Sequence, residues 1–127
     1  MGSSKPPIAV VVEDEASVRD VAVVLFEESE MRVMPCDNAE KAFAILCKHG
    51  DETAVLFADV RLAGLMDGID LAHRVKRMWP HVRIILTSGY SSSRSNLPND
   101  VVYMPKPWLA LDLLMQAERA AVAMHAR

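Results

Sequence analysis

Runs of β-branched and aliphatic residues alternate with helical stretches along the whole chain. Apolar runs of this length without polar alternation are typical of strands that are buried on both faces. The strands are expected at Ile8–Val12, Met31–Pro35, Val55–Ala58, Val82–Thr87 and Val101–Met104, and the helices at Ala16–Ser29, 38–49, Gly68–Met78 and Leu109–His125. This alternation predicts a doubly wound α/β fold, with a five-stranded parallel sheet and helices on both faces.

Size and charge narrow the classes of function. A length of 127 residues suits a single domain, with residues 1–7 as a flexible tail rich in Gly, Ser and Pro and residues 8–127 as the folded part. The net charge of −3 gives no broad basic surface for nucleic acid. No apolar run approaches the roughly 20 residues that span a bilayer. We therefore expect a soluble, cytoplasmic protein that binds neither nucleic acid nor membrane.

Polar side chains stand where the expected strands end. Glu13 and Asp14 follow the first strand, Asp59 the third, Thr87 closes the fourth and Lys106 follows the fifth. The carboxyl ends of parallel strands meet at one edge of a sheet, which is where such folds bind ligands. Three carboxylates gathered there repel one another, and a divalent cation relieves that repulsion. Oxygen ligands in small number favour Mg²⁺.

These residue types also suit phosphoryl chemistry. An Asp carboxylate beside a metal ion can act as a nucleophile toward phosphorus. Phosphoryl transfer depends mainly on positioning and charge neutralisation. Lys106 offers a compact cation for phosphoryl oxygens, and Thr87 offers a hydroxyl donor.

Five short motifs in this order carry a family resemblance. They read Val-Val-Glu-Asp-Glu at 11–15, Leu-Phe-Ala-Asp-Val at 56–60, Met-Asp-Gly at 66–68, Ile-Leu-Thr-Ser-Gly-Tyr at 85–90 and Pro-Lys-Pro-Trp at 105–108. From residue 8 to about residue 125, the chain resembles the receiver domain of two-component response regulators, of the stand-alone type. The resemblance implies the flavodoxin-like strand order 2-1-3-4-5.

The resemblance also implies roles at the metal site. Asp59 would accept a phosphoryl group from a histidine kinase or a histidine phosphotransfer protein. Asp14, Asp59 and the backbone carbonyl of Arg61 would bind Mg²⁺ directly, and Glu13 would hold it through water.

Further implied roles concern the phosphoryl group and the output. Thr87 and Lys106 would bind the phosphoryl oxygens, and Tyr103 would be the aromatic residue that moves with the switch. The domain would not be an enzyme beyond catalysing its own phosphorylation and dephosphorylation. It would act as a monomer or weak homodimer on a downstream protein target.

Two segments depart from the family pattern. The loop after Asp59 has Ala63 where proline is common, and Gly64 makes it one residue longer. Residues 89–100 are rich in Ser and Asn and lack a helical stripe, so the fourth helix is expected to be short or irregular.

The first helix is apolar nearly all round. Its core stripe is expected to comprise Val18, Val21, Ala22 and Leu25. Val23 and Val24 then fall on other faces, and a helix of this kind usually meets a second surface. We expect the kinase to dock there.

Other functions remain as alternatives. A haloacid dehalogenase would need a second carboxylate two places after Asp14, where Ala16 stands. A flavodoxin would need hydroxyl groups where Glu13 and Glu15 would repel phosphate. The chain can also be a receiver segment of a hybrid histidine kinase, or a receiver-like binding module that is never phosphorylated.

Overall fold

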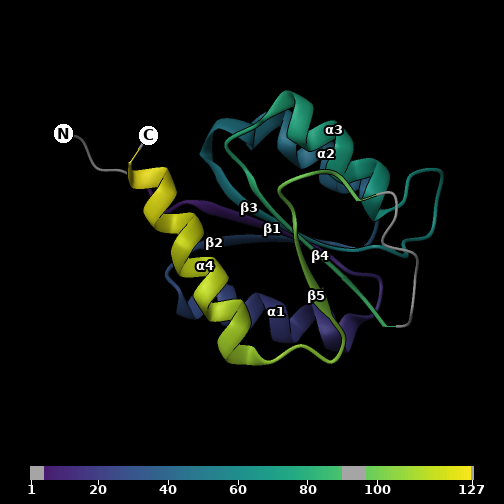
Figure 1. Cartoon of the computed structure of the whole chain (residues 1–127), viewed down its shortest axis with the longest axis horizontal. Helices are drawn as coiled ribbons and strands as arrows, with labels where there is room; N and C mark the ends of the chain where they lie inside the picture. The colour runs from purple at the N-terminus through teal and green to yellow at the C-terminus, as the bar shows by residue number, and fades with distance from the viewer. Residues whose placement is uncertain (1–4, 90–96, 127) are drawn as a thin grey trace.

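The computed structural model describes residues 5–89 and 97–126. Within these ranges the chain forms a five-stranded parallel sheet in the order β2-β1-β3-β4-β5, flanked by helices (Figure 1). The strands are β1 (Ile8–Val12), β2 (Arg32–Cys36), β3 (Thr53–Asp59), β4 (Arg83–Ser88) and β5 (Val102–Pro105). The helices are α1 (Ala16–Glu28), α2 (Ala39–His49), α3 (Gly68–Met78) and α4 (Ala110–His125), with a 3₁₀ turn at Gly50–Glu52. The predicted fold class and strand order are confirmed.

The sheet separates two apolar layers. Alternate residues of each strand point to opposite faces, so Val10 and Leu56 face α2 and α3, whereas Val11 and Phe57 face α1 and α4. Figure 1 shows this pairing of helices, with α2 and α3 on one side of the sheet and α1 and α4 on the other. Every residue of β1 and β3 is buried. This double coverage explains why the central strands are continuous apolar runs.

Helix α1 is rotated relative to the stripe expected from its sequence. Its buried residues are Ala22, Leu25 and Phe26. Phe26 packs edge to face on Phe57, with ring centroids 5.9 Å apart. The prediction that Val21 belongs to the core is wrong, because its side chain is 52% exposed. The large Phe26 ring occupies the apolar layer between α1 and the sheet, which leaves Val21 on the side of α1 that faces solvent.

The expected irregular fourth helix lies mostly outside the described residues, since residues 90–96 are not described. The last helix, α4, begins at Ala110 after Leu109, close to the expected position.

Gly68 permits a close approach between α3 and the end of β3. A Cβ atom on Gly68 would lie 2.0 Å from the backbone carbonyl oxygen of Asp59. The Gly68 amide donates to the Val60 carbonyl at 3.0 Å, and the Val60 amide donates to the Thr87 carbonyl at 2.8 Å. This backbone chain fixes the residues that follow Asp59 against β4, so glycine is required at the start of α3.

Gly68→Ala is expected to lower the free energy of unfolding by about 1–3 kcal/mol, because backbone atoms must move to admit the methyl group. Gly89→Ala is the matched control, since a Cβ there meets its nearest neighbour, Lys106 Cδ, at an ordinary 3.9 Å. Urea denaturation of both variants checks the prediction. Equal stability of the two proteins would show that the approach at Gly68 is not tight.

Candidate functional site

Four strands, β1, β3, β4 and β5, and the loops that follow them bring the predicted polar residues to one edge of the sheet. Asp59, the last residue of β3, is paired in register with Thr87 on β4. The Glu13 amide donates to the Cys36 carbonyl at the end of β2, and the Lys106 amide donates to the Ser88 carbonyl at the end of β4. Backbone hydrogen bonds to neighbouring strands therefore fix the backbone positions of these residues at the edge of the sheet.

Lys106 links two buried carboxylates. Its Nζ lies 2.9 Å from Glu13 Oε1 and 2.8 Å from Asp59 Oδ2. Glu13 is only 1% exposed and Asp59 only 6% exposed. A buried carboxylate without a partner would be strongly destabilising, so this shared ammonium makes the arrangement possible.

Burial and pairing shift two of the pKa values. Burial raises the pKa of Glu13, against the opposing effect of the hydrogen bond from Lys106. Burial by itself would lower the pKa of Lys106, but its hydrogen bonds to Asp59 and Glu13 outweigh this effect and raise it. Lys106 is therefore protonated at neutral pH and supplies one positive charge to the site.

The acidic residues form a cluster that suits a metal ion. Carboxylate oxygens of Glu13, Asp14 and Asp59 all lie within 4.8 Å of one another, and Asp14 is the exposed member. When ionised, the three carboxylates outweigh the single Lys106 charge and leave the cluster negative. An all-oxygen donor set with an excess of negative charge fits a hard divalent cation such as Mg²⁺.

Arg61, two positions after Asp59, also contacts the Asp59 carboxylate. The Arg61 amide donates to Asp59 Oδ1 at 3.0 Å, and the Arg61 side chain is exposed. One Asp59 oxygen is thus held by a backbone donor and the other by Lys106, which fixes the plane of the carboxylate.

Thr87 presents a hydroxyl group that lacks a protein partner. Its Oγ1 is buried and has no hydrogen-bond partner among the described residues. Such a group costs free energy unless another acceptor meets it. A phosphoryl oxygen on Asp59, the register neighbour of Thr87, is a suitable acceptor.

Sequence reasoning missed Ser88 as a site residue. Ser88 Oγ and the Tyr103 hydroxyl lie 2.5 Å apart, which joins the predicted switch aromatic to the strand of Thr87. Ser88 is 2% exposed. The sequence signal that could have identified Ser88 is its position directly after Thr87 in the Ile-Leu-Thr-Ser motif.

An apolar groove opens beside Lys106. It lies between α1 and the segment that joins β5 to α4, and its volume is about 580 Å³. The lining residues are Ser17, Val18, Val21, Gly89, Lys106, Pro107 and Trp108. Exposed Val21 thus borders the same lysine that holds Asp59.

No helix within residues 5–89 and 97–126 has the length and apolar character required to cross a bilayer.

Curated bacterial proteins with similar sequences include two regulators and a sensor kinase. The chain is 31% identical over 125 residues to the hydrogenase transcriptional regulatory protein HoxA of Cupriavidus necator, covering 94% of this chain but 25% of HoxA. It is 26% identical over 118 residues to the response regulator receiver protein CpdR of Brucella abortus, covering 90% of this chain and 96% of CpdR. A further match, to the sensor kinase CckA of Brucella abortus, is 29% identical and spans 11% of that kinase.

Solved structures share the fold. A response regulator receiver domain protein from Clostridium thermocellum superposes with a TM-score of 0.83 at 18% identity, covering 94% of this chain and 98% of that one. A CheY-like receiver domain protein from Methanospirillum hungatei gives 0.82 at 20% identity, covering 95% and 98%. The family model of the response regulator receiver domain matches residues 9–98, which include the β1, β3 and β4 ends of the site. The chain therefore belongs to the receiver domain family of two-component response regulators.

Proposed function

We propose that Asp59 is the phosphoryl acceptor of this receiver domain, with a histidine kinase or histidine phosphotransfer protein as donor. The observation that carries the proposal is the Lys106 ammonium held between the buried carboxylates of Glu13 and Asp59. This arrangement holds the Asp59 carboxyl group beside a fixed cation at the edge where a substrate can approach. The acceptor is thus oriented before the donor arrives.

The transfer exchanges one bond to phosphorus for another. A carboxylate oxygen of Asp59 attacks phosphorus, and a P–O bond forms as the P–N bond of the phosphohistidine breaks. The electron pair of that bond stays on the imidazole nitrogen. The Lys106 ammonium binds an oxygen of the transferred phosphoryl group, and the Thr87 hydroxyl donates to a phosphoryl oxygen.

Asp14, Asp59 and the Arg61 carbonyl would hold Mg²⁺, with Glu13 in reach through water. When bound, the ion neutralises the negative charge of the carboxylates and the incoming phosphoryl oxygens. The acidic cluster supports this assignment because its carboxylates exceed the single ammonium that partners them.

The remaining assignments are part of the same proposal. Residues 8–127 form the receiver domain after a tail of residues 1–7, in a cytoplasmic protein that is a monomer or weak homodimer. It catalyses at most its own phosphorylation and dephosphorylation, and binds no nucleic acid. Movement of Thr87 toward the phosphoryl group would carry Tyr103 with it and change binding to a downstream protein target. The similarity to a part of CckA keeps a hybrid kinase segment as the second candidate.

Asp59→Asn is expected to abolish phosphorylation by acetyl phosphate and Mg²⁺, because the amide is not a nucleophile toward phosphorus. Intact mass spectrometry should find one added phosphoryl group on the wild-type protein and none on the variant. Asp20→Asn, an exposed change on α1, should label normally. A variant without Asp59 that labels as fully as the wild type would contradict the acceptor assignment.

Asp14→Ala is expected to weaken Mg²⁺ binding by at least about tenfold, because it removes a charged oxygen ligand. Titration can be followed by Trp108, which lines the groove beside Lys106 and packs on Phe57 with centroids 5.5 Å apart. A Trp79→Phe background isolates that signal. Asp20→Ala is the charge-matched control. An unchanged Mg²⁺ affinity without the Asp14 carboxylate would rule out this metal site.

The donor protein is expected to dock over the groove between α1 and Lys106. Val21→Glu should slow transfer from the cognate kinase about fivefold or more, because it places a charge in an apolar contact. Labelling by acetyl phosphate should not change. Val122→Glu is the control, since Val122 is 62% exposed on α4 and does not line the groove. Equal loss with both phosphoryl donors would instead indicate a misfolded site.

A further inference from the structure

The loop between β3 and α3, residues 60–67, follows Asp59 and carries the Arg61 carbonyl. Two of its side chains are anchored in the core, with Leu62 8% exposed and Met66 9% exposed. Between them, Ala63 and Gly64 are exposed, and Leu65 is 100% exposed. Apolar burial therefore does not hold the tip of the loop.

A carboxylate from another helix holds the loop instead. Glu40 Oε2 accepts a hydrogen bond from the Met66 amide at 2.9 Å, across 26 positions of sequence. Glu40 lies in the first turn of α2. The Glu40 side chain therefore connects α2 to the loop at the residue that precedes Asp67.

Gly64 fits the loop around the same carboxylate. Its φ of +111° is a backbone conformation that residues with a side chain rarely adopt. A Cβ on Gly64 would lie 2.9 Å from Glu40 Oε1. The backbone thus passes close to one Glu40 oxygen while the Met66 amide binds the other.

The held segment leads directly back to the acceptor. The Arg61 amide binds Asp59 Oδ1 at 3.0 Å, and buried Leu62 follows it. At the other end, the Asp67 side chain caps α3, whose first residue, Gly68, packs on the Asp59 carbonyl. A shift at Met66 is therefore transmitted to Arg61 and Asp59 along a short, restrained path.

We infer that Glu40 is a positioning residue for the phosphorylation site, acting as a clamp on the loop after Asp59. The inference rests on the proposed function, because the clamp matters by fixing the Arg61 carbonyl that would bind Mg²⁺. Residues behind the direct ligands commonly tune metal affinity in this way. The part played by Glu40 is geometric: its side-chain oxygen must reach the Met66 amide.

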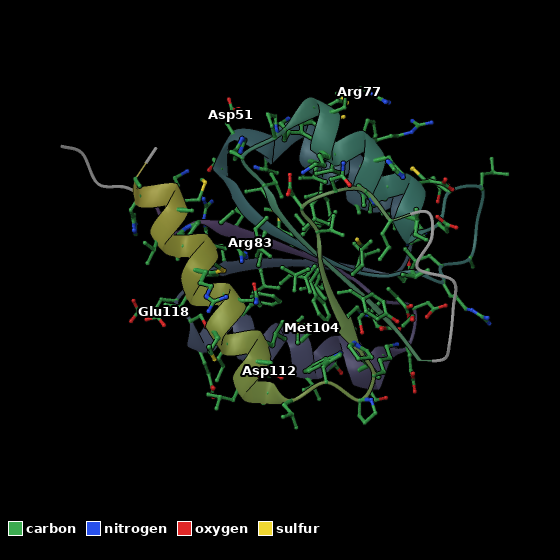
Figure 2. All side chains as sticks on the ribbon, viewed as in Figure 1. Asp51, Arg77, Arg83, Met104, Asp112 and Glu118 are labelled. Carbon is green, nitrogen blue, oxygen red and sulfur yellow. The ribbon has the colours of Figure 1, made fainter. Side chains whose placement is uncertain are left out.

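Three substitutions of Glu40 separate the length of the side chain from its charge. Glu40→Ala removes the acceptor oxygen and the charge. Glu40→Asp keeps the charge on a shorter side chain, and Glu40→Gln keeps an acceptor oxygen at full length without the charge. Glu118→Ala is the control, since Glu118 is an exposed residue of α4, far from α2 (Figure 2). Urea denaturation of each variant identifies any that fail to fold.

The first measurement is hydrogen exchange of the Met66 amide in the metal-free protein. Exchange should be about two- to tenfold faster in Glu40→Ala and Glu40→Asp, which corresponds to the usual net worth of a hydrogen bond. Glu40→Gln and Glu118→Ala should exchange like the wild type. The second measurement is Mg²⁺ affinity, which should fall by a similar factor in the same two variants.

Wild-type exchange or wild-type Mg²⁺ affinity in Glu40→Asp would overturn the clamp, as would a Glu40→Gln variant that behaves like Glu40→Ala. If the wild-type protein binds Mg²⁺ and labels on Asp59 while all Glu40 variants match it, the clamp alone is refuted. A wild-type protein that does neither would overturn the proposed function and the clamp together.

Discussion

The placement of two buried carboxylates beside one ammonium is the constraint on which this site depends. Glu13 and Asp59 are nearly inaccessible, and Lys106 touches both. Removing charged groups from water is costly, so the pair is tolerated only because the fold holds the ammonium at hydrogen-bond distance. The negative charge that remains explains why a divalent cation is a suitable ligand at this edge. The Thr87 hydroxyl, buried without a partner among the described residues, suits an acceptor such as a phosphoryl oxygen.

The surrounding fold supplies the precision that this pairing needs. The sheet places Asp59 in register with Thr87 and holds the Lys106 backbone to Ser88. Gly68 lets α3 begin against the Asp59 carbonyl, and the Glu40 carboxylate meets the loop from the other side. Side chains that are positioned by rigid strands keep their geometry better than side chains on free loops. In the proposed function, the movement that follows phosphorylation would be confined to Thr87, Ser88 and Tyr103, of which Ser88 and Tyr103 are joined through their hydroxyl groups.

The central strands, and the gathering of polar residues at one edge of the sheet, were predictable because burial on both faces leaves few sequence choices. Continuous apolar runs identified β1 and β3, and the polar residue that ends each run identified Glu13 and Asp59. Which side of α1 packs on the sheet was not predictable in the same way. Val21 and Phe26 are both apolar, and periodicity does not say which one the sheet covers; the match of Phe26 to Phe57 decides it. The Glu40 contact was invisible for another reason. An acidic residue in a first helical turn is common through its interaction with the helix dipole, and its partner lies 26 residues away.

In the proposed function, the side chain of Asp59 carries the phosphoryl group. An acyl phosphate is reduced by borohydride to an alcohol, which would convert a phosphorylated aspartate into homoserine. The most direct measurement is therefore peptide mass spectrometry of the full chain after phosphorylation and reduction. Homoserine is expected at position 59, with unmodified residues at positions 13 and 14. Reduction at position 14, with an unmodified Asp59, would refute the assignment of Asp59 as the acceptor.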